Sequence, residues 1–197
     1  FSGSTSLIVK YDLGAQNYTR KSLMKFSLSG VPEDADHIYL TYELTGAPSA
    51  DFDTANIYHV DSDWEGNSVT FNSFPERKGT EPDAVMTKSM TSESLIQKLD
   101  VTDAVRGAVR DGESEISFEI SIPTAAGNNY VGIHSSRTAK EGAVKPALTW
   151  DTDYEPEKIV KKNLSFIKDL ASGINTSEFS NVDEARLRRL IADAERI

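Results

Sequence analysis

The sequence contains no cysteine and only three histidines. The absence of cysteine excludes disulfide bonds, thiolate metal sites and cysteine nucleophiles. Such a composition fits a cytosolic protein, or a bacterial secreted protein that does not rely on disulfides. The sequence also lacks an apolar run of about 20 residues and a recognisable signal peptide, so it predicts no membrane partner. It begins at Phe1 in the middle of a strand-like pattern, and we expect it to be a piece of a longer protein.

Catalytic motifs are also lacking. The sequence has no G-x-S-x-G element and no loop with the spacing of a phosphate-binding motif. A lyase needs a charge neutraliser, a base and an acid that converge in a cleft. Tyr130, His134 and Arg137 could supply such groups, but nothing in the sequence marks a cleft around them. The sequence therefore predicts that this piece is not an enzyme and needs no cofactor.

Positive charge is scarce. The formal net charge is −10, and hydrophobic residues make up 38% of the chain. Residues 1–150 hold 13 basic and 21 acidic side chains, and the remainder holds 8 and 10. Neither part is basic, which argues against a general nucleic-acid binder. A local basic patch can still act on an acidic background, because salt screens charges beyond about 8–10 Å.

The pattern that dominates residues 1–150 is alternation between apolar and polar side chains. It is clearest in residues 20–29, 37–45 and 114–122, where every second residue is apolar. Gly, Pro, Asn and Asp separate the segments. Many short antiparallel strands of this kind predict a mainly β fold, an antiparallel β-sandwich of jelly-roll-like character. Further strands are expected at residues 7–11, 56–61, 68–72, 95–99, 130–134 and 147–150.

One short helix is expected within residues 100–112, with Thr102 or Asp103 as its N-cap and Gly112 at its end. After Trp150 the pattern changes, and apolar residues at helical spacing predict a two-helix C-terminal extension. We therefore expect two parts, a β-sandwich over residues 1–150 and a helical linker, or the start of a following domain, over residues 151–197. Two amphipathic helices cannot bury both apolar stripes alone, so they should pack on the sandwich, on each other or on an adjacent domain of a longer chain.

A basic cluster stands out near the start of the chain. Residues 7–28 read as two strands joined by a loop, and they carry Lys10, Arg20, Lys21 and Lys25. Alternation places Lys21 and Lys25 on one strand face, so we expect a face with several cations and few acids. Such a face suits a polyanion whose carboxylates repeat about every 5 Å, close to the spacing of neighbouring strands. The alternative is that these lysines serve only solubility and protection of a sheet edge.

Other side chains could extend this basic face. Arg137 and His134 lie near the last loop, with Lys140 and Lys145. Alternatively, Arg137 pairs with a carboxylate and His134 is a satisfied polar residue beside the sheet. Tyr11 and Tyr18 flank the basic segment and could stack against sugar rings.

Two pairs of aspartates could supply metal ligands. Asp51 and Asp53 are two residues apart, as are Asp61 and Asp63, a spacing compatible with Ca²⁺ ligation. No EF-hand pattern accompanies them, and aspartates in loops commonly form turns. The prediction is no metal, with a structural calcium ion as the alternative.

The order of these segments resembles a known family. The segments that carry the resemblance are SLIVKYD followed by NYTRKSLMKFSLSGVP, then IYHVDSDWEGNSVTFNSFP, LDVTDAVRGAVRDGESEISFEIS and GIHSSRTAKEGAVKPALTW. In this order they resemble the DNRLRE domains, grouped with carbohydrate-binding module family 96, over about residues 3–150. The family's usual first strand is absent, and the helical tail has no counterpart in the family pattern.

This resemblance implies a function. It implies a non-catalytic carbohydrate-binding module that anchors a secreted or cell-surface bacterial enzyme to an anionic polysaccharide such as alginate. The ligand-binding residues would be Lys10, Tyr11, Arg20, Lys21, Lys25, His134 and Arg137. The alternatives are a structural or adhesive spacer, or the non-catalytic part of a polysaccharide lyase.

Overall fold

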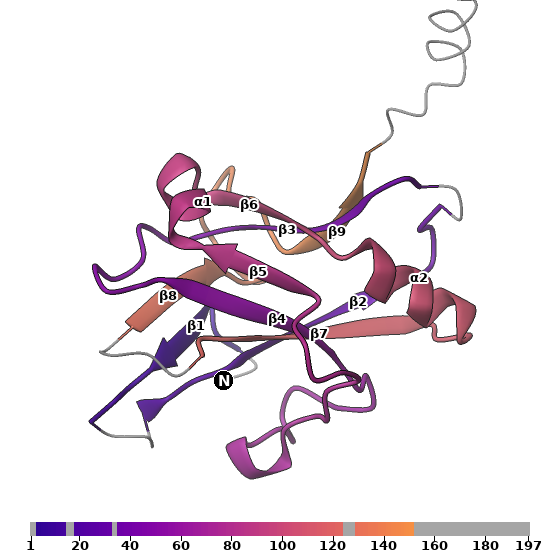
Figure 1. The fold of residues 1–197 in the computed structure, drawn as a ribbon, viewed down its shortest axis with the longest axis horizontal. Coiled ribbons are helices and arrows are strands. Elements are labelled where there is room, and N and C mark those ends of the chain that lie inside the picture. The colour runs from indigo at the N-terminus through magenta and orange to yellow at the C-terminus, as the bar shows by residue number, and fades with distance from the viewer. Residues whose placement is uncertain (1–2, 15–17, 33–34, 124–128, 152–197) are drawn as a thin grey trace, which may run out of the picture. The chain divides into compact units, whose positions relative to one another are not determined.

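The computed structural model describes residues 3–14, 18–32, 35–123 and 129–151 (Figure 1). The predicted helices of the C-terminal extension lie outside these residues, and the division at residue 150 stays a prediction. The strands are β1 (Ser6–Tyr11), β2 (Ser22–Ser27), β3 (Ile38–Glu43), β4 (Thr54–Val60), β5 (Ala84–Thr87), β6 (Ile96–Asp100), β7 (Glu115–Ser121), β8 (Asn129–His134) and β9 (Ala147–Trp150). The α-helices are α1 (Lys88–Glu93) and α2 (Thr102–Arg110), and a 3₁₀ turn spans Phe71–Ser73.

The strands form antiparallel sheets with the orders β2-β7-β4-β5, β6-β3-β9 and β1-β8. A bridge between Leu44 and Ile133 connects the end of β3 to β8, and a bridge between Lys10 and Arg20 connects β1 to β2. The pair β1-β8 therefore links the other two sheets along one side. This arrangement confirms the predicted mainly β, antiparallel sandwich.

Residues 7–28 form two strands, as predicted, but these strands do not pair with each other along their length. β1 pairs along its length with β8, and β2 pairs along its length with β7. Figure 1 shows β1 and β8 side by side, although they are far apart in sequence. β1 and β2 meet at the single bridge between Lys10 and Arg20. Each strand buries its apolar face in a different sheet, and burial outweighs the proximity of the two strands in the chain.

The core follows the predicted alternation. Phe118 and Ile120 on β7 and Leu40 and Tyr42 on β3 are fully buried. Burying a side chain such as Ile120 or Phe118 stabilises the fold by about 1.5–3 kcal/mol. The opposite faces of these strands carry polar residues, such as Thr41 on β3 and Glu119 on β7.

The structure changes several local predictions. The expected helix is present as α2, but its N-cap is Val101, and the Asp100 carboxylate accepts a hydrogen bond from the Thr102 amide at 3.0 Å. Residues 68–72 do not form a strand, because Thr70 and Ser73 form a capping box around the 3₁₀ turn. β5 and the second short helix, α1, were not predicted. No helix among the described residues is long and apolar enough to cross a membrane.

Candidate functional site

Two cations and two tyrosines gather where β1 meets β2. We call Lys10, Tyr18, Arg20 and Tyr130 the cationic rim. Lys10 and Arg20 exchange backbone hydrogen bonds of 2.9 and 2.8 Å, and Tyr130 on β8 lies directly opposite Lys10. Residues that are opposite each other in antiparallel strands share a face, so these side chains leave the same side of the sheet. Tyr18 and Tyr130 are 51% and 50% exposed, and the Lys10 Nζ lies 5.6 Å from the centroid of the Tyr18 ring.

The cations of the rim differ in how they are paired. The Lys10 ammonium forms a 2.9 Å ion pair with Asp12. Arg20 is exposed, and its guanidinium donates to the Tyr18 carbonyl at 3.5 Å. Among the described residues, Arg20 makes no ion pair with a carboxylate. Its planar set of donors is therefore available for bidentate binding of a carboxylate.

Lys21 and Lys25 belong to a different surface, the outer face of the sheet β2-β7-β4-β5. The Lys21 Nζ lies 3.1 Å from Glu119, and the Lys25 Nζ lies 3.5 Å from Glu115. The expectation of a single basic face with few acids is therefore wrong. It failed because β7 brings its glutamates beside β2, a pairing that joins residues more than 80 positions apart.

These lysines also hold the segment that follows β4. The Lys25 Nζ lies 4.9 Å from the Trp64 ring centroid and donates to the Trp64 carbonyl at 2.9 Å. The Lys21 Nζ lies 5.1 Å from the Phe74 ring centroid. The Arg77 guanidinium carbon lies 3.5 Å from the Tyr58 ring centroid. Cation–aromatic contacts of this kind stabilise by about 0.5–2 kcal/mol each, so the three contacts fasten residues 61–78 to the sheet.

Glu119 is the centre of this outer face. Its side chain is 1% exposed, and it accepts hydrogen bonds from Arg77, one of them an Nε contact of 3.3 Å. Burial disfavours its charge, but the hydrogen bonds from Arg77 and Ser121 and the charge of Lys21 outweigh burial. The pKa of Glu119 is therefore lowered. A buried carboxylate with two cationic partners indicates a structural role for Lys21.

Arg137 and His134 lie toward the other end of the β1-β8 pair. His134 is opposite Ser6, and its Nδ1 lies 3.0 Å from the Thr138 hydroxyl. His134 is buried, whereas Arg137 is exposed and, among the described residues, makes no ion pair with a carboxylate. His134 is four residues from Tyr130 along β8, about 13 Å at the rise of a strand. The structure therefore does not bring Tyr130, His134 and Arg137 together as a catalytic trio.

Tyr11 is half-buried and packs against the hydrophobic core. It lies opposite Asn129, which is also buried. Its alternation with Lys10 places it on the inner side of β1, away from the cationic rim. Its predicted role as a sugar contact is therefore better filled by Tyr18 and Tyr130.

The aspartate pairs occupy separate positions. Asp61 forms a 2.6 Å ion pair with Lys78, and the backbone carbonyl of Asp53 accepts a hydrogen bond from the Lys88 amide at 2.7 Å. Asp51 and Asp63 are exposed. In the part of the chain that the structure describes, no group of three or more His, Cys, Asp or Glu side chains could hold a metal ion. Metal content stays a prediction.

Sequence reasoning missed three residues that determine these surfaces, namely Asp12, Arg77 and Glu119. Alternation did place Glu119 on the polar face of its strand. The missing information was which strands lie beside it. Asp12 could have been found from its spacing, because residues 10 and 12 of a strand project to the same side.

The comparisons with known proteins agree with this architecture. No curated protein matches the chain. The family model of carbohydrate-binding module family 96 matches residues 1–151, which is more than half of the 197 residues. The match confirms the resemblance drawn from the order of the segments, and modules of this kind are typically non-catalytic. The chain belongs to carbohydrate-binding module family 96.

Proposed function

We propose that this carbohydrate-binding module binds an acidic polysaccharide, with alginate as the representative polymer, through the cationic rim. Bound in this way, it would hold a secreted or cell-surface bacterial enzyme on its polymer. The adjacent domain would then be the catalytic one, for example that of a polysaccharide lyase.

The observation that carries the proposal is the setting of Arg20. Its guanidinium is exposed, makes no ion pair with a carboxylate among the described residues, and donates to the backbone carbonyl of Tyr18, whose ring is itself exposed. A uronate residue offers a carboxylate for the guanidinium and a sugar face for an aromatic ring. A charge-assisted hydrogen bond of this kind contributes about 1.5–3 kcal/mol.

Arg137 supports the same polymer class. Arg20 and Arg137 are both exposed and lie toward opposite ends of the β1-β8 pair. Two cations separated along one sheet suit a repeating polyanion better than a small anion. The net charge of −10 argues against non-specific attraction to any polyanion, so binding would depend on this local arrangement.

The competing function is a spacer that only positions its neighbours. It is favoured by the ion pairs of Lys10, Lys21 and Lys25, since a cation that is already paired gains less from a ligand. Arg20 and Arg137 distinguish the two functions. Binding of an anionic polymer would use their exposed guanidinium groups, whereas a spacer would not need them.

The test is affinity electrophoresis of the full chain in gels that contain alginate, chondroitin sulfate or a neutral glucan. We expect retardation in the acidic gels. The variant Lys10→Ala/Arg20→Ala should bind alginate about 10–100-fold more weakly, from the loss of about 1.5–3 kcal/mol. Its dependence on salt concentration should also become shallower.

The matched control is Lys98→Ala/Arg110→Ala, which removes the same two residue types from exposed positions elsewhere, and Lys98, like Lys10, is paired with an aspartate. It should bind as the wild type does. A folded wild-type protein that is retarded in no gel would refute the proposal. If both double variants bind alginate equally weakly, the rim contributes only through overall charge, and the proposal of a specific site is refuted.

Lys21→Ala/Lys25→Ala separates ligand contact from structure. Because both lysines are paired with glutamates, we expect lower stability with alginate affinity changed less than in the rim variant.

Incubation of the chain with alginate should give no rise in unsaturated-uronate absorbance. Such a rise would show that this piece itself is an enzyme.

A further inference from the structure

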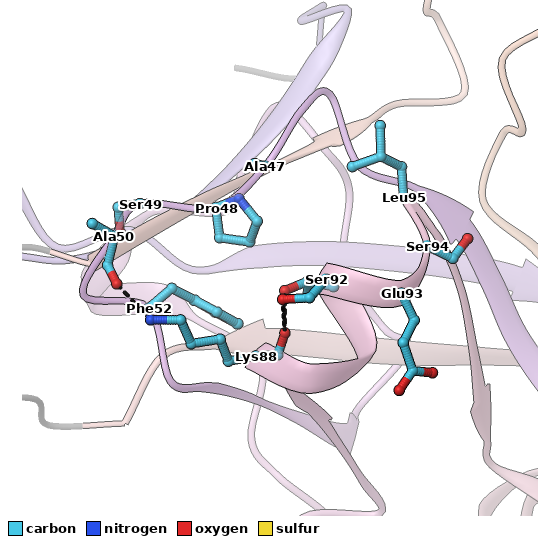
Figure 2. A pocket seen from close by; sticks show the side chains of 11 residues that line it. Ala47, Pro48, Ser49, Ala50, Phe52, Lys88, Ser92, Glu93, Ser94 and Leu95 are labelled. Carbon is cyan, nitrogen blue, oxygen red and sulfur yellow. Dashed lines mark hydrogen bonds between the residues drawn. The ribbon is translucent and has the colours of Figure 1, made fainter.

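A hollow of about 630 Å³ lies between α1 and the loop that follows β3. This volume falls within the range of small-ligand sites, about 300–1,000 Å³. Figure 2 shows the loop from Ala47 to Phe52 on one side and α1 with its continuation to Leu95 on the other. None of the residues that line this hollow belongs to the cationic rim.

The walls of the hollow are fixed by hydrogen bonds. The Lys88 ammonium reaches across to the Ala50 carbonyl at 2.7 Å, as Figure 2 shows, and the Phe52 amide donates to the Ser49 carbonyl at 2.9 Å. The helical side is closed by the Thr91 hydroxyl, which donates to the Lys88 carbonyl at 2.9 Å. The hollow is therefore already formed without a ligand, which lowers the entropic cost of binding.

The lining combines apolar walls with a polar rim. Phe52 is buried at the base, while Pro48 and the 40% exposed Leu95 present apolar surface. Among the described residues, the exposed Glu93 carboxylate has no hydrogen bond or ion pair. A free carboxylate can accept hydrogen bonds from two neighbouring hydroxyls of a sugar, and the apolar walls can contact its C–H face.

The charge around the hollow selects against anions. Lys88 is the cation there, whereas Glu93 lines the hollow and Asp51 and Asp53 lie on or next to its loop. This excess of carboxylates is opposite to the charge expected for binding a uronate. In a chain that belongs to a carbohydrate-binding family, this charge favours an uncharged sugar over a uronate.

The hollow is connected to the exposed surface of β8. The Ser49 amide donates to the Tyr130 carbonyl at 3.0 Å, and the Tyr130 amide donates to the Ser49 hydroxyl at 3.0 Å. Tyr130 belongs to the cationic rim, so the hollow and the rim are neighbouring sites. We propose that the hollow binds an uncharged sugar residue at a site separate from the cationic rim.

The test is a titration of the isotope-labelled full chain with cellobiose, mannobiose and galactobiose, followed by the backbone amide resonances. At least one disaccharide should shift the amides of Ser49, Ala50 and Glu93 while leaving Arg20 unchanged. A separate titration with an alginate oligosaccharide should shift Arg20. The two proposals therefore fail independently.

Two variants make the assignment specific. Ala47→Trp should fill the hollow and weaken the disaccharide by about tenfold or more, equivalent to at least 1.4 kcal/mol. Ala139→Trp is the matched control, an exposed alanine that does not line the hollow, and it should bind as the wild type does. Glu93→Gln, which keeps the side-chain size, should also weaken binding.

The proposal is overturned if none of the three disaccharides shifts the amides around the hollow. It is also overturned if a disaccharide shifts them equally in the wild type and in a folded Ala47→Trp variant. The wild-type titration tests the proposal by itself, so the proposal can still be refuted if a variant fails to fold.

Discussion

The buried carboxylate of Glu119 should make Arg77 important for stability. Arg77 provides two of the donors that hold this carboxylate, and it also lies against Tyr58. The informative change is Arg77→Met, which removes the charge but retains an apolar chain over the tyrosine ring. Glu119 is then left in the sheet with Lys21 as its cationic partner.

The magnitude follows from burial. Removal of one partner from a buried ion pair typically costs about 3–5 kcal/mol, because a charge remains without compensation. Here Lys21 remains 3.1 Å from Glu119 and keeps part of the compensation. We therefore expect Arg77→Met to lower the free energy of unfolding by about 2–3 kcal/mol. For a module of this size the melting temperature should fall by roughly 5–10 °C.

The assay is urea unfolding at pH 7, followed by circular dichroism and by tryptophan fluorescence. The double variant Arg77→Met/Glu119→Leu tests the cause, since it removes the buried charge together with its partner. It should lose less stability than Arg77→Met alone. A double variant whose loss equals or exceeds the sum of the two single losses would refute the reasoning.

The dependence on pH has a definite sign. The folded state lowers the pKa of Glu119, whose unfolded value is about 4.3. The stability that this group contributes is therefore present above about pH 4.3 and is lost as the pH falls through the lower folded pKa. In Arg77→Met this lowering should be smaller, so acid should change the stability of the variant less across this range than it changes that of the wild type.

Two further changes test local packing. A Cβ on Gly132 would clash with the Thr45 hydroxyl oxygen, so Gly132→Ala should lower the free energy of unfolding by about 1–3 kcal/mol. Adding Thr45→Ala should restore most of this loss, because the Thr45 Cβ would lie at an ordinary 3.5 Å, and no restoration would contradict the clash. Lys25→Met removes the bond to the Trp64 carbonyl and the contact with its ring, and should cost about 1 kcal/mol in urea unfolding. The same change should shift tryptophan emission to longer wavelength, and an unchanged spectrum would indicate that Lys25 does not hold this segment.

Much of the fold was predictable because its signals are local. The alternation in residues 114–122 identified β7 and the polar position of Glu119, since strand geometry sends successive side chains to opposite faces. The helix α2 was also predictable from its apolar spacing and from Gly112, which has a φ of 77° and ends the helix region. α1 escaped prediction because a six-residue helix carries little periodicity.

The candidate site was predictable in composition but not in arrangement. Sequence reasoning selected Lys10, Arg20, Lys21 and Lys25 as one group. The structure assigns Lys10 and Arg20 to the cationic rim and the other two to the outer face of another sheet. This division depends on which strands pair, and strand pairing joins residues that are distant in sequence.

The sequence by itself determined the β architecture, the absence of cysteine chemistry and the membership of a carbohydrate-binding family. These properties follow from residue types and from alternation, which strand geometry imposes on each segment independently. Only the tertiary structure decided which cations remain available. It placed Glu119 beside Lys21 and left Arg20 exposed next to Tyr18, because charge neutralisation requires partners within a few ångströms that the chain supplies from distant strands.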